Sequence, residues 1–211
     1  MPGPRMLRVG LTGPSGAGKS TVARMLAARG IPVVDADRAA HELYRPGSLL
    51  VADLAREFGS DVLDPEGGID RARLGGLVFA HPERLARLNA IVHPPLVRRV
   101  REELDALEAA GHRVGVVEAA VLLHWDPLAF LDLVVGVTAP RSVRRRRLIE
   151  SGLSGEAAEA RLDRQVDESE LARRSRFLLL NDRGLDRLDR QVEALARQLA
   201  RLAPGSETEE G

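Results

Sequence analysis

The chain has 211 residues, of which 44% are hydrophobic, so it can bury a core and is expected to form one domain, with or without an inserted lobe. Its 31 basic and 31 acidic residues cancel to a net charge of zero, which argues against a general polyanion binder. The absence of cysteine excludes disulfides and thiolate metal sites, and no apolar run reaches the roughly 20 residues of a membrane span, so we expect a cytoplasmic protein.

The N-terminal part predicts a strand, a loop, a helix and a second strand. A short apolar run over residues 7–12 is typical of a buried strand. A helix is expected over residues 18–29, with Gly30 as its stop, and a second strand over residues 31–34. Ligands of open α/β sheets bind where strands end, so the loop after the first strand is a candidate site.

This loop, Gly13–Ser20, matches the pattern G-x-x-x-x-G-K-[ST] at every position. Its backbone N–H groups and the helix N-terminus suit phosphate groups, Lys19 can reach the β- and γ-phosphates, and Ser20 can join a Mg²⁺ shell. The alternative is a glycine-rich turn that only links strand to helix, but Lys19 is the single lysine among the 31 basic residues. We therefore predict that ATP binds through Gly13, Ser15, Gly16, Ala17, Gly18, Lys19, Ser20 and Thr21.

The same lysine count separates classes of nucleotide-binding protein. The guanine-selecting N-K-x-D motif of GTPases needs a second lysine, which this chain lacks. The L-S-G-G-Q signature of transport ATPases is matched only in its first three letters, at Leu153–Gly155. Both classes are disfavoured.

Two carboxylates, Asp35 and Asp37, follow the second predicted strand. Alternation along an extended backbone places them on the same side if the strand continues that far. One carboxylate can then hold Mg²⁺ through water, and the other can accept a proton from an attacking hydroxyl. The alternative is that Asp35 caps the following helix and Asp37 is solvated.

The rest of the chain alternates between helical and strand-like segments. Residues 38–111 predict several helices joined by turns, one of them at His93-Pro94-Pro95. Further strands are expected near residues 113–123, 131–137 and 176–180, and further helices over residues 142–150 and 185–202. Strands separated by helices predict an α/β fold with a mostly parallel, five-stranded sheet.

Several segments together resemble the dephospho-CoA kinase family over nearly the whole chain. They are Val9–Gly13, the loop through Thr21, Val33–Asp37, Phe58-Gly59, Gly67–Arg71, Leu74, Val78-Phe79 and Ile91–Pro94. The resemblance implies a P-loop kinase fold. It also implies ATP-dependent phosphorylation of the ribose 3′-hydroxyl of dephospho-coenzyme A, the last step of coenzyme A synthesis, with ATP and Mg²⁺.

The resemblance also implies roles for parts of the chain. The kinase core would comprise about residues 5–37 and 113–203, with a helical acceptor-binding insert at about 38–112 and a lid at about 141–165. The composition of residues 204–211, which is polar and acidic, separately predicts a disordered tail. Asp37 resembles the catalytic carboxylate of the family. We therefore expect Asp35 to be the carboxylate that binds Mg²⁺. Where the family has a glutamate after the third core strand, Glu118 is the candidate substitute. The acceptor-site candidates are Asp37, Arg71, His93, Arg161 and Gln165, and Arg71 is named because guanidinium binds phosphate through two hydrogen bonds. The alternatives are a surface or ion-paired arginine at position 71, a histidine that ends a helix at position 93 and a neutral surface pair at positions 161 and 165.

The densest basic segment is Arg141 with Arg144–Arg147. Consecutive arginines cover all sides of a helix, so they cannot all reach one ligand. We expect two or three of them to be solvated or paired with Glu150 and its neighbours, and Arg147 to contact the transferring phosphoryl group when the lid closes. Zero net charge and few aromatic residues argue against nucleic acid as the partner.

Two other functions stay open at this point. One is that of another small-molecule kinase of the P-loop class, such as a nucleoside monophosphate kinase, and the other is that of an ATP-binding regulatory module with little transfer activity. The expected partners are ATP and dephospho-coenzyme A, without nucleic acid or membrane, on a monomer or small homo-oligomer.

Overall fold

A computed structural model describes residues 5–120, 122–125, 128–163 and 168–205. The chain divides into two units, of which unit 1 comprises Met1–Val34 and Glu103–Gly211, and unit 2 comprises Asp35–Glu102. Of the tail that we predicted to be disordered, residues 206–211 lie outside the described residues. Each unit has its own apolar core, and each is described by itself.

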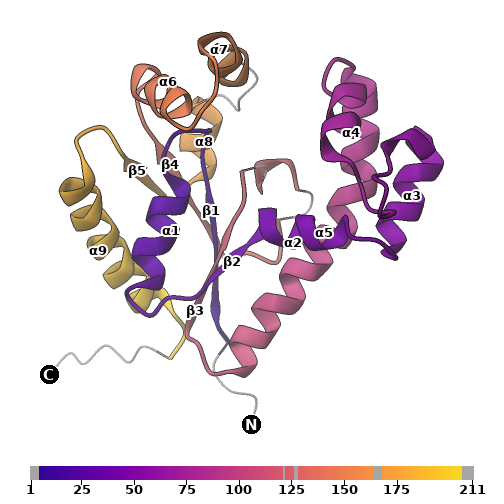
Figure 1. Ribbon diagram of the computed structural model, residues 1–211. Helices are drawn as coiled ribbons and strands as arrows, with labels where there is room; N and C mark the ends of the chain where they lie inside the picture. Colours follow the sequence, from indigo (N-terminus) through magenta and orange to yellow (C-terminus); the bar gives the residue numbers. More distant parts are fainter. Residues whose placement is uncertain (1–4, 121, 126–127, 164–167, 206–211) are drawn as a thin grey trace, which may run out of the picture. The chain divides into compact units, whose positions relative to one another are not determined.

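The centre of unit 1 is a five-stranded sheet in the order β2-β3-β1-β4-β5 (Figure 1). β1 pairs in parallel with both β3 and β4, and β4 pairs in parallel with β5. The predicted parallel α/β sheet is confirmed. The strands are β1 (Leu7–Thr12), β2 (Val33–Asp35), β3 (Val114–Glu118), β4 (Leu133–Thr138) and β5 (Phe177–Leu180).

Two helices cover one face of this sheet, α1 (Lys19–Ala27) and α9 (Leu185–Leu202) (Figure 1). α9 buries Leu188, Val192 and Leu195, which recur at helical spacing and pack against the strands. The predicted helix over residues 185–202 is therefore confirmed. The remaining helices that lie within unit 1 are η2 (Leu122–His124), α6 (Arg141–Glu150), α7 (Gly155–Asp163) and α8 (Glu168–Arg174).

Unit 2 is helical, and its core is formed by apolar side chains of α3, α4 and the first part of α5. Between α3 and α4 the chain makes a tight turn at Gly67, which has φ 84°, and Leu63 and Ile69 form an antiparallel bridge across it. The helices are α2 (Ala36–Leu43), α3 (Leu49–Phe58), η1 (Ser60–Val62), α4 (Arg71–Val78) and α5 (Pro82–Ala109), of which α5 has its residues from Glu103 on in unit 1.

The turn that we predicted at His93-Pro94-Pro95 is wrong, because α5 continues through both prolines. Proline removes a backbone donor and crowds the preceding turn, so a helix that contains it needs compensation. Here the buried residues Val92 and Leu96 lie on either side of the prolines at a spacing of four, and Val100 and Leu104 continue the same stripe. Burial of this stripe offsets the lost hydrogen bonds.

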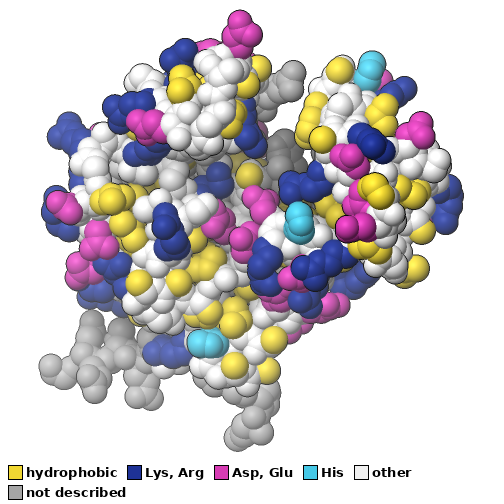
Figure 2. Space-filling view, viewed as in Figure 1, with side chains coloured by type: hydrophobic (Ala, Val, Ile, Leu, Met, Phe, Trp, Pro, Cys, Tyr) yellow, Lys and Arg dark blue, Asp and Glu magenta, His cyan; other side chains and the backbone are white. Residues whose placement is uncertain are grey.

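Basic and acidic side chains lie among one another on the face shown in Figure 2. This distribution agrees with the net charge of zero. None of the helices within the described residues has the length and apolar character needed to cross a membrane.

Candidate active site

The predicted phosphate loop joins the end of β1 at Thr12 to the start of α1 at Lys19. The strand and the helix that flank the motif are thus confirmed. Gly13 passes so close to β4 that a Cβ atom there would lie 2.0 Å from the carbonyl oxygen of Val137, and therefore no other residue fits. Because the loop ends at the first turn of α1, backbone N–H groups without helical partners lie at the motif.

Lys19 is half-buried and extends back across the loop. Its Nζ donates to the carbonyl oxygens of Gly13 at 2.9 Å and Pro14 at 3.3 Å. The ammonium group is therefore fixed at the mouth of the loop by backbone oxygens. An ammonium at this place can pair with a phosphate group that binds to the loop.

Ser20 and Glu118 place two oxygen ligands beside the loop. Ser20 is exposed in the first turn of α1, and its Oγ donates to Glu118 Oε1 at 2.8 Å. Glu118 is the last residue of β3, the position where we had named it as a substitute glutamate. A hydroxyl and a carboxylate suit Mg²⁺, which keeps several waters and is usually completed by substrate phosphates. The described residues contain no cluster of three or more histidine or acidic side chains that would form a cage from protein alone.

Arg147 is the arginine of α6 whose guanidinium lies against the phosphate loop. It donates to the carbonyl oxygens of Gly16 at 3.1 Å and Ala17 at 3.4 Å. It also donates to the backbone and side-chain oxygens of Asn181, at 3.3 Å and 3.1 Å. Burial, with a smaller contribution from the positive charge of Arg146, lowers the pKa of Arg147 from its ordinary value, although arginine stays charged in proteins.

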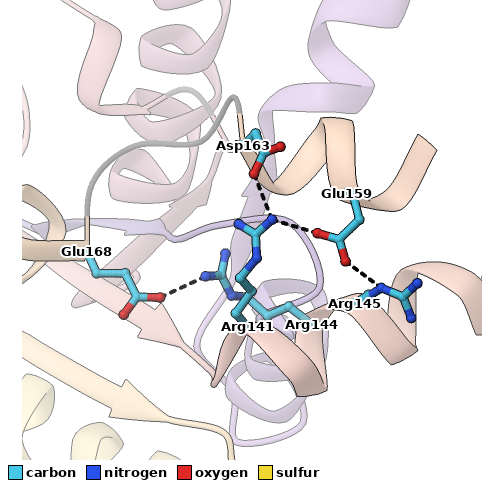
Figure 3. A network of polar contacts seen from close by, with 6 residues as sticks. All are labelled: Arg141, Arg144, Arg145, Glu159, Asp163 and Glu168. Atoms are coloured by element: carbon cyan, nitrogen blue, oxygen red, sulfur yellow. Dashed lines mark hydrogen bonds and ion pairs between the residues drawn. The ribbon is translucent and has the colours of Figure 1, made fainter. Parts of the chain in front are cut away.

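The other arginines of α6 also pair with carboxylates, but mostly not with Glu150 as we expected. Arg146 lies 3.7 Å from Glu150, whereas the remaining three bind carboxylates beyond α6 (Figure 3). Arg141 binds both Glu159 and Asp163 of α7, and Arg145 binds Glu159 at 2.5 Å. These pairs connect α6 to α7 along their exposed sides. Arg144 differs because it is buried, with its Nε donating to the carbonyl oxygen of Ala139 and its Nη2 to Glu168.

The two aspartates after β2 differ from the extended arrangement that we predicted. The strand ends at Asp35, and α2 begins at Ala36, so Asp37 lies in the first turn of a helix. Asp35 caps α2 by accepting a hydrogen bond from the backbone N–H of Arg38 at 3.0 Å. The strand does not continue to Asp37, so the extended arrangement is wrong and the alternative, in which Asp35 caps the helix and Asp37 is solvated, is confirmed. The capping bond uses Oδ1 of Asp35, and the carboxylate of Asp37 is exposed.

Unit 2 contains two further candidates. Arg71 begins α4, and its guanidinium lies 3.3 Å from Nδ1 of His41. The pKa of the Tyr44 phenol is raised by burial, and the positive charge of Arg71 opposes that rise, which places Tyr44 in the same cluster. His93 is half-buried in the middle of α5, where we had predicted a turn.

The lid candidates lie on or after α7. Arg161 is exposed near the end of this helix, which stops at Asp163. Gln165 lies outside the described residues. Sequence reasoning did not propose Asn181 as a site residue, although its side chain contacts the loop from 164 residues away. The signal for it was the Asn-Asp pair directly after the last predicted strand, where ligands of such sheets bind.

Comparison with known proteins gives one consistent result. The family model described as dephospho-CoA kinase matches residues 7–187. The dephospho-CoA kinase of Anaeromyxobacter dehalogenans is 45% identical over 174 residues, which are 82% of this chain and 82% of that protein. The dephospho-CoA kinase of Streptomyces avermitilis is 39% identical over 207 residues, which are 97% of this chain and all (100%) of that protein.

Solved structures agree in fold. The crystal structure of TT1252 from Thermus thermophilus has a TM-score of 0.78 and 36% identity, and the match covers 92% of this chain and 98% of that one. The dephospho-CoA kinase of Campylobacter jejuni has a TM-score of 0.69 at 24% identity, with 92% and 97% covered, and it supports the fold alone.

Proposed function

The chain belongs to the dephospho-CoA kinase family, and from this premise we propose how its residues carry out the family's reaction. The reaction is the ATP-dependent phosphorylation of the ribose 3′-hydroxyl of dephospho-coenzyme A, the last step of coenzyme A biosynthesis. The main support for these residue roles is the position of the single lysine. Its Nζ donates to the carbonyl oxygens of Gly13 and Pro14 at the mouth of the loop.

ATP binds with its phosphates in the loop between β1 and α1. Backbone N–H groups surround the β-phosphate, and Lys19 neutralises charge that accumulates on the β- and γ-phosphates during transfer. Arg147 is proposed as a further positive group for the phosphoryl group in transfer. The complete proposed set is Gly13, Ser15, Gly16, Ala17, Gly18, Lys19, Ser20, Thr21 and Arg147.

Mg²⁺ fits the oxygen ligands that the chain provides. Ser20 and Glu118 would hold it, with Asp35 as a ligand through water, since the capping bond of Asp35 uses Oδ1. When bound, Mg²⁺ shields the negative charge of the phosphates. The donor set contains only hydroxyl and carboxylate oxygens, which is the type that Mg²⁺ prefers.

Asp37 is proposed as the base that acts on the acceptor. Its exposed carboxylate accepts the proton of the 3′-hydroxyl, while the new bond from that oxygen to the γ-phosphorus forms and the bond to the leaving ADP oxygen breaks. We expect Asp37→Asn to lower kcat by about 10²-fold or more, because the amide cannot accept this proton. Steady-state kinetics with varied ATP tests the role, and a variant that mainly weakens ATP binding would contradict it.

The helical insert is proposed to bind the acceptor. Arg71 is suited to anionic groups because guanidinium binds phosphate through two parallel hydrogen bonds. His93, Arg161 and Gln165 are proposed as further acceptor contacts, and residues 141–165 as the lid. We also propose a cytoplasmic enzyme, a monomer or small homo-oligomer, that acts without nucleic acid or membrane.

The acceptor distinguishes this function from the alternatives. A coupled assay of ADP release should respond to dephospho-coenzyme A and stay at the basal rate with a panel of nucleoside monophosphates and sugars. Activity that prefers a nucleoside monophosphate would favour a nucleotide kinase. A slow ATPase rate that no acceptor changes would favour a regulatory module.

A further inference from the structure

Asn181 connects the end of the sheet to the phosphate loop. It directly follows β5, its side chain is buried, and its backbone N–H donates to the carbonyl oxygen of Thr138 at the end of β4 at 2.8 Å. The side chain donates one hydrogen bond and accepts another. Its Nδ2 donates to the carbonyl oxygen of Ala17 at 2.8 Å, and its Oδ1 accepts from Arg147 at 3.1 Å. We call this arrangement of Ala17, Asn181 and Arg147 the Asn181 bridge.

The bridge sets the direction of two consecutive peptide groups in the loop. The carbonyl oxygen of Gly16 accepts from Arg147, and that of Ala17 accepts from both Asn181 and Arg147. In a planar trans peptide the C=O and N–H bonds point in opposite directions. The N–H groups of Ala17 and Gly18 therefore point away from the bridge.

The direction of the first of these N–H groups is visible in the loop itself. The N–H of Ala17 donates to the carbonyl oxygen of Pro14 at 3.2 Å, and the same oxygen accepts from Nζ of Lys19 at 3.3 Å. The N–H of Ala17 thus turns to the side of the loop where Nζ of Lys19 lies. The carbonyl oxygen of Pro14 on this side is bound to Nζ of Lys19. A further carbonyl oxygen turned to this side would repel a phosphate, whereas an N–H group binds it.

Gly18 fits the bridge closely. A Cβ atom at this position would lie 2.3 Å from Nδ2 of Asn181, so the side chain of Asn181 occupies the space that a larger residue would need. Gly18 also has φ 100°, which favours glycine. The contact leaves little freedom for the peptide group between Ala17 and Gly18 to rotate.

We infer that Asn181 is a positioning residue for ATP: through the Asn181 bridge it orients the peptide groups of Gly16–Gly18 so that their N–H groups face the phosphates. The inference rests on the proposed role of the loop in binding ATP. It assigns Asn181 no contact with the reacting atoms. Its effect is on the phosphates of the nucleotide and not on the acceptor.

Asn181→Asp tests this role with almost no change in shape. The aspartate keeps an oxygen for Arg147 but places a second oxygen, without a proton, against the carbonyl oxygen of Ala17. We expect KM and Kd for ATP with Mg²⁺ to rise about tenfold, because a hydrogen bond is replaced by repulsion between two acceptors. KM for dephospho-coenzyme A and the Kd of AMP, which lacks the β- and γ-phosphates, should stay within about twofold.

Gln191→Ala is the matched control. Gln191 of α9 also makes two hydrogen bonds to the chain near the end of β5, to the N–H and the carbonyl oxygen of Leu180 at 3.1 Å and 3.0 Å. Gln191 thus holds the residue next to Asn181, but among the described residues it makes no hydrogen bond to the phosphate loop. Its removal should lower Tm and leave KM for ATP unchanged.

Asn181→Ala provides a second variant if the aspartate prevents folding. It also removes the hydrogen bond to Ala17, so it should likewise raise KM for ATP. Affinity for ATP within about twofold of the unmodified protein in a folded variant would overturn the inference. So would equal losses for ATP and AMP, which would place the effect on the nucleoside. If Lys19→Ala also left ATP binding intact, the proposed function of the loop would fail, and not the inference alone.

Discussion

The charged groups of unit 1 fall into two regions that differ in what they bind. At the phosphate loop and the inner side of α6, Lys19, Arg144 and Arg147 donate to backbone carbonyl oxygens. Along the exposed side of α6 and α7, Arg141 and Arg145 bind the flexible carboxylates of Glu159 and Asp163 (Figure 3).

The difference explains how one helix can carry so many arginines and still serve one site. A backbone carbonyl has a fixed position, so an arginine bound to it also fixes the loop that carries the carbonyl. A pair of exposed side chains can separate and be screened by salt, and it contributes little to stability. We therefore expect substitutions in the first region to affect ATP or stability strongly and those in the second to have small effects.

The largest effect is expected from Lys19→Ala. Loss of the ammonium group at the mouth of the loop should lower kcat/KM by about a thousandfold or more, because charge on the transferring phosphoryl group is left without its partner. Rate measurements at saturating dephospho-coenzyme A check this, with circular dichroism to establish that the variant folds. Near-normal turnover in a folded variant would remove Lys19 from the mechanism.

Arg144→Met should have the largest effect on stability. The substitution leaves the carbonyl oxygen of Ala139 without a donor in a buried place, which costs about 2 kcal/mol. For a chain of this size that corresponds to a fall in Tm of about 4–8 °C. Arg141→Met is the control on the exposed side. Thermal melts that show equal shifts in Tm for both variants would contradict the difference between the two regions.

Glu108 is an acidic residue that, like Lys19 and Arg147, binds a group of the backbone. Its Oε1 accepts from the backbone N–H of Met6 at 2.9 Å, and its Oε2 pairs with Arg8. The Met6 hydrogen bond, followed by the Arg8 hydrogen bond, lowers the pKa of Glu108 from its ordinary value of 4.5. Because the folded pKa is depressed, the stabilisation is present above pH 4.5 and is lost as the pH falls through the lower folded value.

Glu108→Gln should therefore destabilise the protein by about 1 kcal/mol at neutral pH, because it removes the charged acceptor. The difference in Tm between the two proteins should shrink as the pH falls below 4.5. Thermal melts from neutral to acidic pH measure it. A difference that stays constant over this range would mean that the charge of Glu108 is irrelevant.

The smallest effect is expected from Glu159→Gln. The pKa of Glu159 is lowered mainly by its hydrogen bonds to Arg141 and then Arg145, but 42% of this side chain is accessible to solvent. Removal of its charge should change Tm by about 1 °C or less at moderate salt. A large loss of stability would show that the surface network is as important as the backbone-bound charges.

The phosphate loop was predictable because its information is local. Eight consecutive residues, Gly13–Ser20, specify the turn, the ammonium group and the start of the helix. The parallel sheet was predictable for a similar reason, since short apolar segments alternate with longer amphipathic ones. These features need no contact between distant parts of the chain.

The predictions that failed concern residues for which two local structures compete, or whose partner lies far away in the sequence. Local rules predict a break at Pro94-Pro95, but burial of Val92, Leu96 and the residues beyond continues the helix. Asp35 can extend a strand or cap a helix, and the cap prevails. Asn181 was missed because its partner is Ala17, and no local pattern links residues so far apart.

Calorimetric titration of Mg²⁺-ATP into Arg147→Met and Arg145→Met tests the central claim, that only the backbone-bound arginine of this pair serves the nucleotide. Both substitutions remove one positive charge from α6, so they differ in position and not in net charge. Weakening of about tenfold for Arg147→Met, with Arg145→Met within about twofold of the unmodified protein, is the predicted result. Equal weakening by both variants, or none by either, would contradict it.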